Sequence, residues 1–156
     1  MMLTVLKVTI HDNTSHKFFV FFFRCTCERC EPMPTEPENV CCLESQKVQD
    51  LVDRYPSDAI CVTDHMFFEG LCLNPWTLDA AWNAYAQQYG TGGRYSTVER
   101  RRRHTAYRNF VRAAHGRLGR HIRVKIPSCV VNIVRRTFPN ENGDEDYTGY
   151  LPFWEQ

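Results

Sequence analysis

The chain has 156 residues, which suffices for one domain with a single apolar core. Apolar residues make up 43% of it and the formal net charge is +1, so its composition excludes a disordered or uniformly charged chain. The charges are nevertheless segregated, because residues 94–136 carry 13 basic and 1 acidic side chains, residues 24–93 carry 4 basic and 11 acidic, and residues 137–156 carry 5 acidic and none basic. This pattern indicates either self-neutralisation or one anion-binding face.

The eight cysteines indicate metal binding rather than disulfide bonds. The one apolar run, from Phe18 to Phe23, is shorter than the core of a secretory signal or a membrane span. Clustered cysteines without a route to an oxidising compartment are typical of metal sites. We therefore expect a cytoplasmic protein without a transmembrane segment.

Residues 1–24 are interpreted as a variable, disordered leader or linker. Two alternatives remain, a β-strand and a peripheral membrane contact through Phe18 to Phe23 and an acylated Cys25. An exposed run of phenylalanines would promote aggregation, so we expect another surface to cover it.

Five of the eight cysteines lie in residues 25–42. Three prolines between the two cysteine groups predict an irregular loop, which suits metal ligands of fixed geometry. Cys27-x-x-Cys30 has a spacing common in zinc sites, and the diverging side chains of Cys41 and Cys42 suggest two neighbouring metals. Two separate tetrahedra need eight ligands, whereas seven suffice with one bridging thiolate and six with two.

The other three cysteines lie further along the chain. Cys61 and Cys129 would have to reach the loop through tertiary structure, and Cys129 follows Pro127 at a predicted helix start, where the helix dipole favours a thiolate. A small buried apolar residue is the alternative for Cys129, and an ordinary core residue is the interpretation of Cys72. Cys25 stays open between ligand, free thiol and acylation site. No residue is assigned a catalytic role, because metal binding would use most of the thiolates.

The hydrophobic pattern predicts several helices. Asn74 is a good N-cap before Pro75, and Gly90 closes the helix that they begin. The predicted segments are a short helix over 44–55, another from residue 63 or 64 to 72, longer helices over 75–89 and 97–118, an extended stretch at 121–126, a last helix over 128–137, and an acidic loop-like tail.

The basic helix over 97–118 carries Arg103, His104 and Tyr107 on neighbouring positions of one face. A guanidinium and an imidazole suit phosphate, and an aromatic ring suits a base or ribose. The alternatives are a solvated helix face, a localisation signal and a nucleic-acid contact, although few aromatic residues interleave with the arginines. The chain lacks the glycine-rich motifs of P-loop and dinucleotide-binding proteins.

The ordered set of these motifs resembles the intracellular C-terminal domain of the ATP-gated P2X purinoceptor, subtype seven, often called the ballast domain. The resemblance covers about residues 25–153 and leaves 154–156 as a tail. The motifs that carry it are Cys25-x-Cys27-x-x-Cys30, Cys41-Cys42, Cys61, Arg103-His104-x-Ala106-Tyr107-Arg108, Ile126-Pro-Ser-Cys129, Arg135-Arg-x-Phe138-Pro139 and Tyr147-Thr-Gly149-Tyr150.

The resemblance implies a mainly α, compact, zinc-stabilised helical domain with a two-zinc cysteine cluster and a guanine-nucleotide site for GDP or GTP. The implied zinc ligands are Cys27, Cys30, Cys41, Cys42, Cys61 and Cys129. The implied nucleotide-binding residues are Arg103, His104 and Tyr107, with Val124, Thr148 and Gly149 matched by position. A lysine expected after Phe-Pro is Asn140 here, and the segment before Tyr147 is longer and more acidic.

The resulting hypothesis is a zinc-binding intracellular regulatory or interaction module that binds a guanine nucleotide. The alternative is a zinc-dependent nucleic-acid-binding module. A GTP hydrolase is less favoured, because the sequence offers no P-loop and no carboxylate pair for Mg²⁺. The sequence does not identify a protein partner.

Overall fold

The computed structural model describes residues 25–55, 57–90, 97–119 and 122–140. Within these ranges the fold is helical, without β-strands, which confirms the mainly α class. The elements are the 3₁₀ turns η1 (Glu36–Glu38), η2 (Cys42–Glu44) and η3 (Val62–Asp64), the α-helices α1 (Gln46–Val52), α2 (Met66–Phe68), α3 (Pro75–Tyr89), α4 (Val98–His115) and α5 (Ser128–Thr137), and the π-helical turn η4 (Glu69–Leu73).

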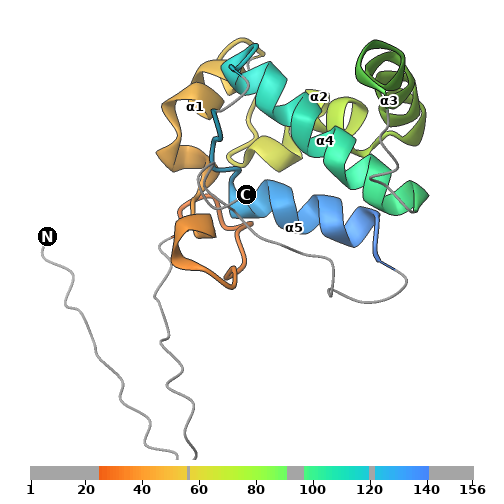
Figure 1. The fold of residues 1–156 in the computed structure, drawn as a ribbon. Helices are drawn as coiled ribbons and strands as arrows, with labels where there is room; N and C mark the ends of the chain where they lie inside the picture. Colours follow the sequence, from red (N-terminus) through yellow and green to blue (C-terminus); the bar gives the residue numbers. More distant parts are fainter. Residues whose placement is uncertain (1–24, 56, 91–96, 120–121, 141–156) are drawn as a thin grey trace, which may run out of the picture.

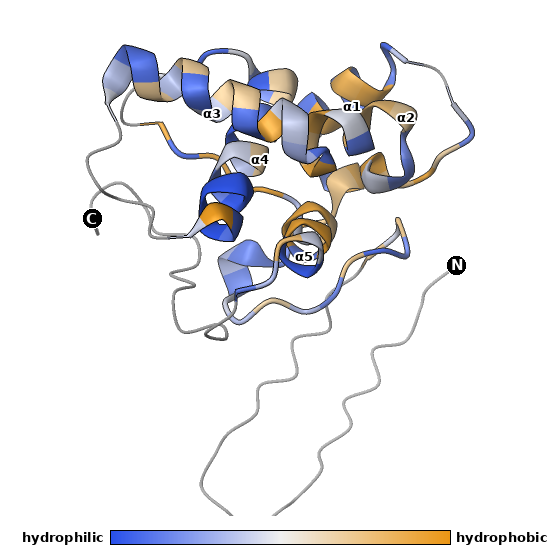
Figure 2. Ribbon diagram, turned by 90° about the vertical axis from the view of Figure 1, so that its right-hand side faces the viewer, coloured by the Kyte–Doolittle hydropathy of each residue, from blue (hydrophilic) through white to orange (hydrophobic). Residues whose placement is uncertain are grey.

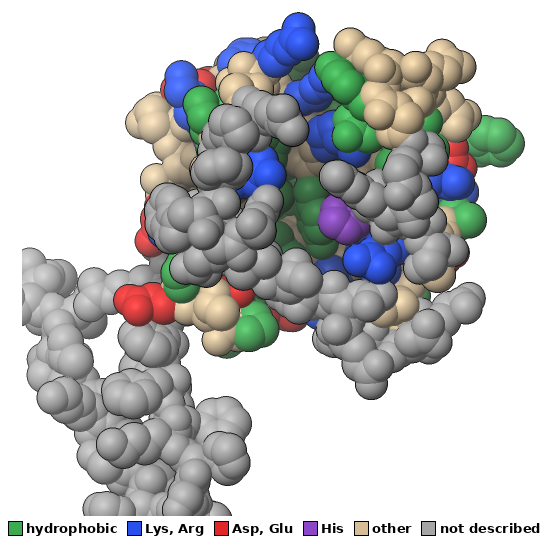
Figure 3. All heavy atoms as spheres, viewed as in Figure 1, with side chains coloured by type: hydrophobic (Ala, Val, Ile, Leu, Met, Phe, Trp, Pro, Cys, Tyr) green, Lys and Arg blue, Asp and Glu red, His purple; other side chains and the backbone are tan. Residues whose placement is uncertain are grey.

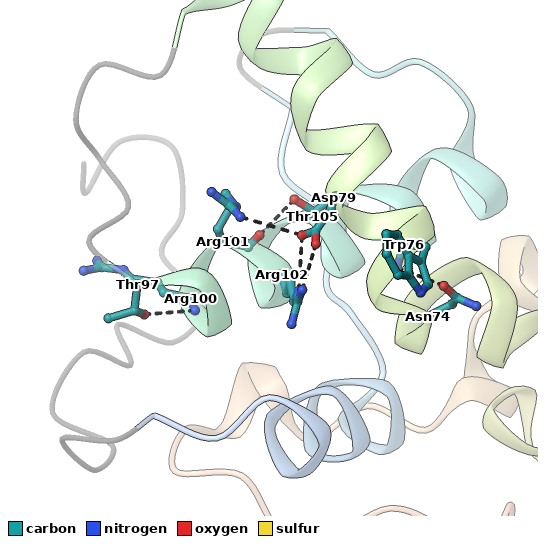
Figure 4. Close-up of polar contacts among 8 residues, drawn as sticks. All are labelled: Asn74, Trp76, Asp79, Thr97, Arg100, Arg101, Arg102 and Thr105. Carbon is teal, nitrogen blue, oxygen red and sulfur yellow. Dashed lines mark hydrogen bonds and ion pairs between the residues drawn. The ribbon is translucent and has the colours of Figure 1, made fainter.

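The two longest helices begin at the caps that local chemistry favours (Figure 4). The Asn74 side-chain oxygen accepts hydrogen bonds from the backbone N–H groups of Trp76 and Thr77 at 3.0 and 3.2 Å, and Pro75 needs no such partner. The Thr97 hydroxyl accepts one from the N–H of Arg100 at 3.2 Å. These caps fix where α3 and α4 start, and thereby the register of the arginines on α4.

Helix α4 is the central element of the described fold, because it packs against α1, α3, η4 and α5. Figure 1 shows α4 and α5 side by side, with α3 beyond one end of α4 and α1 beside the other. The segment of residues 25–45, coloured orange, lies next to the N-terminal end of α5. The cysteine loop and the basic helix therefore share α5 as a neighbour.

The core forms where α4 and α5 meet the short elements. Phe68 and Phe110 are both fully buried, and their rings meet edge to face with centroids 6.2 Å apart. Helix α5 contributes Val130 and Val134 to the same core, and Figure 2 shows its apolar residues on the side toward the other helices. All six buried cysteines belong to this cluster, so the candidate metal centre is continuous with the core.

Several sequence-based boundaries differ from the observed ones. The helix expected over 44–55 is shorter, because α1 covers only Gln46–Val52. Helix α4 ends at His115 rather than at residue 118, because Gly116 adopts φ 72°, a left-handed conformation that favours glycine and ends the helix. The helix expected before residue 72 splits into α2 and a π-helical turn, in which the N–H of Asn74 donates to the Glu69 carbonyl at 2.9 Å. Residues 122–126 form no strand, and residues 120–121 lie outside the described part.

Within the described residues, no helix is both long and apolar enough to cross a membrane. The phenylalanine run from Phe18 to Phe23 and the tail from residue 141 onward lie outside them. The expectations for the leader, for Thr148 and for Gly149 therefore stay predictions.

Candidate metal centre

The loop that carries most of the cysteines is ordered by its own polar groups. The Asn39 side chain accepts a hydrogen bond from the N–H of Met33 at 2.8 Å and donates to the Met33 and Thr35 carbonyls at 3.1 and 2.7 Å. The Glu44 carboxylate accepts one from the N–H of Cys41 at 2.9 Å. Glu28 adopts φ 62°, and this left-handed residue turns the chain between Cys27 and Cys30. The backbone is thus shaped around the sulfur atoms.

Seven cysteines form two groups of four that share one member. We call them the outer group (Cys25, Cys27, Cys30 and Cys41) and the inner group (Cys27, Cys42, Cys61 and Cys129). In each group the Sγ atoms all lie within 4.8 Å of one another. The adjacent Cys41 and Cys42 divide between the two groups, as their diverging side chains suggested.

The sulfur separations suit tetrahedral coordination of a single ion in each group. A Zn–S bond of about 2.3 Å places neighbouring sulfurs of a tetrahedron about 3.8 Å apart. In the outer group Sγ of Cys27 lies 3.5 Å from Cys25 and 3.6 Å from Cys30. In the inner group Cys42 and Cys61 are 3.9 Å apart. These separations are far longer than a disulfide bond, and all seven cysteines are free. The donor set therefore fits two thiolate-bound zinc ions with one bridging sulfur.

Helix α5 brings Cys129 to the inner group. Its first N–H, from Ser128, donates to the Val40 carbonyl at 2.9 Å, which ties the start of the helix to the residue before Cys41. Further along, Arg136 donates to the Glu31 carboxylate at 2.8 Å. Cys129 lies in the first turn of α5, where the helix dipole stabilises a thiolate.

The thiols of the inner group compete for protons. The sulfur of Cys30, a member of the outer group, and then the sulfurs of Cys42 and Cys61 raise the pKa of Cys129 far above its usual range. The sulfur of Cys129, followed by that of Cys42, lowers the pKa of Cys61. Buried sulfurs at these distances cannot all be thiolates unless a cation neutralises them. A bound metal ion would supply that charge.

The two cysteines that the sequence analysis leaves outside the ligand set, Cys25 and Cys72, differ from each other. Cys25, which the sequence analysis leaves open and outside the ligand set, lies in the outer group. The available signal was the count of seven ligands with one bridge, but six ligands with two bridges fitted the sequence equally well. Cys72 lies outside both groups, where its Sγ donates to the Ala106 carbonyl at 3.8 Å and burial raises its pKa to about 12. It is a core residue.

Several arginines of the run on α4 (Arg100–Arg103 and Arg108) make hydrogen bonds, ion pairs or ring contacts with other parts of the fold. Asp79 of α3 accepts hydrogen bonds from Arg102 at 2.7 and 3.2 Å and pairs with Arg101 at 3.8 Å, as Figure 4 shows. The guanidinium of Arg108 lies 3.6 Å from the centre of the Tyr85 ring, a cation–π contact. These contacts attach α4 to α3.

The residues matched to a nucleotide site lie toward α5 instead. The Arg103 guanidinium donates to the Phe138 carbonyl at 2.7 Å. Burial raises the pKa of Tyr107 to about 12, although the charges of Arg135 and Arg103 oppose the shift. Its hydroxyl is buried and finds no hydrogen-bond partner among the described residues. Desolvation by its neighbours and then the charges of Arg100, Arg103 and Arg108 lower the pKa of His104, although this residue is exposed at the surface.

Figure 3 shows Lys and Arg side chains, a histidine and hydrophobic side chains at the surface between the residues that are not described. Val124 is partly buried on the segment before α5.

The family model of the P2X purinoreceptor 7 intracellular domain matches residues 8–151. The chain belongs to this family. Comparison with curated proteins and comparison with solved structures give no significant match. The family match begins within the expected leader, and it spans every cysteine of the outer and inner groups.

Membership of the P2X purinoreceptor 7 intracellular domain family agrees with the resemblance carried by the cysteine and arginine motifs. Taken together with the cysteine geometry, it describes an intracellular-domain module whose two cysteine groups could each hold a metal ion.

Proposed function

We propose that this domain is a cytoplasmic regulatory or interaction module that is held together by two zinc ions and binds a guanine nucleotide at α4. The observation that carries the zinc proposal is the pair of four-cysteine groups that share Cys27. Seven thiolates satisfy two tetrahedral ions when one sulfur bridges them, which is the count that the chain supplies.

The donor set favours zinc with a structural role. Sulfur-only, four-coordinate sites are typical of zinc or of iron–sulfur clusters, and zinc sites whose four ligands all come from protein leave no position for a substrate. The inner group is fully buried and joins residues from three distant parts of the chain. Such a site contributes to folding rather than to catalysis.

Native mass spectrometry of the chain, purified without added metal or nucleotide, tests the zinc proposal. We expect two zinc ions per chain and no visible absorption band of an iron–sulfur cluster. A folded, monodisperse chain that carries no metal would refute it.

The proposed nucleotide site rests on Arg103, His104 and Tyr107. They combine a guanidinium, an imidazole and an aromatic ring, and the unpartnered Tyr107 hydroxyl is a polar group that a ligand could satisfy. Because Arg103 also donates to Phe138, a bound phosphate would meet a guanidinium whose position is already restrained. We extend the site by resemblance to Val124, Thr148 and Gly149.

The nucleic-acid alternative is less well supported by the contacts of the arginine run. Arg101 and Arg102 pair with Asp79, and Arg108 covers Tyr85. Side chains engaged in this way are not an open row of phosphate contacts. The GTP hydrolase hypothesis gains no support, because no group positioned as a catalytic base has been assigned.

A polarisation assay with fluorescent GDP separates these functions. We expect saturable GDP binding that tolerates moderate salt, whereas oligonucleotide binding that falls steeply with salt would favour the alternative. Phosphate release from GTP would indicate a hydrolase.

Two variants locate the nucleotide site. Tyr107→Phe removes only the hydroxyl, so it should leave stability unchanged or slightly higher and weaken GDP binding. Arg103→Ala should weaken GDP binding strongly with zinc content unchanged. Arg112→Ala, at an exposed position of the same helix, is the matched control and should bind GDP normally. Equal binding by all three variants would place the nucleotide elsewhere.

A further inference from the structure

The two cysteine groups differ in their access to solvent and in their place in the chain. All four members of the inner group are buried, and they come from the cysteine loop, from residue 61 and from α5. The outer group is drawn from residues 25–41 alone, and its Cys25 and Cys30 are partly exposed. Solutes in water can therefore reach two residues of the outer group, whereas all four residues of the inner group are buried.

We propose that Cys25 and Cys30 form a redox-sensitive pair, which peroxides oxidise to a disulfide with release of the outer metal ion only. The inference rests on the proposed zinc cluster. It adds a modification site and its chemical class of reagent, and it assigns different roles to the two ions.

The reaction balances with two thiolates and one peroxide. One exposed sulfur attacks the O–O bond, which forms a sulfenic acid and releases hydroxide. The second sulfur attacks the first, which forms the S–S bond and releases a second hydroxide. The two sulfurs supply the two electrons that the peroxide accepts. Cys27 and Cys41 would then be the only two protein ligands left to a zinc ion in the outer group, which would dissociate because a site with half of its ligands binds zinc weakly.

Cys25 and Cys30 are chosen for two reasons: the other two members of the outer group are buried, and one of those, Cys27, also belongs to the inner group. Cys27 and Cys41 are both buried, at 3% and 0% exposure, so the reagent meets the other two members first. All sulfurs of the outer group lie within 4.8 Å, close enough for a small loop movement to join them. A bond between these two leaves Cys27 free, and the inner group keeps all four of its ligands.

The test uses the full chain with both ions bound and limiting hydrogen peroxide. Native mass spectrometry should record the loss of one of two zinc ions, and peptide mapping after alkylation should find a disulfide between Cys25 and Cys30. A dithiol reductant with added zinc should restore the second ion. The chain should keep its far-UV circular dichroism throughout, since the inner group stays intact.

The buried Cys72 serves as an internal reference, because it lies outside both groups and becomes alkylated only when the fold opens. The variant Cys72→Ala should behave like the parent chain. Loss of both ions in one step, a disulfide that includes Cys27, or alkylation of Cys72 together with metal loss would each overturn the proposal. A starting content of zero ions would instead refute the zinc cluster itself, so the two failures are distinct.

Discussion

The sharpest prediction compares two adjacent residues, Cys41 and Cys42. Each supplies one sulfur to a different group, and both are fully buried. Serine is nearly isosteric with cysteine but is a poor zinc ligand, so each single substitution removes one ligand from one group. Cys42→Ser opens the inner group and Cys41→Ser opens the outer one.

The expected magnitudes follow from what each group holds. Structural zinc contributes about 10–16 kcal/mol in small domains, whereas a whole domain is stable by about 5–15 kcal/mol. The inner group joins the loop, Cys61 and α5, so Cys42→Ser should remove most of the stability and unfold the domain. The outer group joins residues of one loop, so Cys41→Ser should lower Tm yet keep the helices. The double variant should be unfolded.

Thermal unfolding followed by far-UV circular dichroism, with zinc measured on the same samples, provides the assay. Cys72→Ala is the control, because removing one buried sulfur outside both groups should cost only about 1–2 kcal/mol. If Cys42→Ser melts at the temperature of the parent chain and retains both ions, the inner group is not a structural metal site.

Three further predictions concern the helical scaffold and the cysteine loop. Phe110→Ala should cost about 3–5 kcal/mol in the free energy of unfolding measured with urea, because it opens a cavity beside Phe68, whereas Tyr89→Ala, at 54% exposure, should cost under about 1 kcal/mol. Asp79→Asn should destabilise the domain at neutral pH, and the difference from the parent should shrink as pH falls through and below the usual Asp pKa of about 3.9. The reason is that hydrogen bonds from Arg102 lower the pKa of Asp79 in the folded chain. The carboxylate therefore stabilises the fold at pH values above the usual Asp pKa, and this stabilisation is lost as the folded carboxylate takes up a proton. A difference in stability that does not depend on pH would contradict this. Glu28→Gly should raise stability by about 0.5–1 kcal/mol in the same urea assay, because glycine tolerates the left-handed backbone there, and a loss of stability would indicate a role for the carboxylate.

Local signals predicted the helices well where the chain carries strong caps. Asn74, Pro75 and Gly90 gave both ends of α3, and the expected start of α4 at residue 97 coincides with its observed N-cap, Thr97. They worked because capping satisfies backbone donors within a few residues and needs no tertiary partner. The end of α4 was placed too late, since the hydrophobic pattern continues to Leu118 although Gly116 already adopts a left-handed conformation.

The cysteine site could be predicted only in part. The loop spacing and the adjacent pair suggested two metals, but membership depends on contacts between distant residues. Nothing in the local pattern of Cys25 separates a ligand from a free thiol, whereas the fold places its sulfur 3.5 Å from Cys27. Cys72 could be distinguished from the metal ligands because its neighbours Leu71 and Leu73 already indicate a core position.

The role of the arginines depended on tertiary structure for the same reason. The sequence gives one basic run, and periodicity alone does not say which guanidiniums are already engaged. The fold divides them, because Arg101, Arg102 and Arg108 turn to α3 while Arg103 turns to the end of α5. This division leaves Arg103, with Tyr107, as the pair on which a nucleotide experiment is best focused.

Helix α5 connects the inner group with the proposed nucleotide site. Its first turn carries Cys129, and the carbonyl of Phe138 just after its last turn accepts the hydrogen bond from Arg103. Ten residues of α-helix form a rod of about 15 Å, so an ion held by the inner group would fix the position of a group that restrains Arg103. No member of the outer group lies on α4 or α5.

Loss of the outer ion should therefore leave nucleotide affinity unchanged. We expect chain oxidised by limiting peroxide, with one zinc ion retained, to bind GDP with the Kd of the parent chain in the polarisation assay. Chelation that removes both ions should abolish binding, because α5 is then no longer anchored to the cysteine loop. If the one-ion form binds GDP at least tenfold more weakly, the outer group also positions the nucleotide site, and the separation of roles between the two ions is wrong.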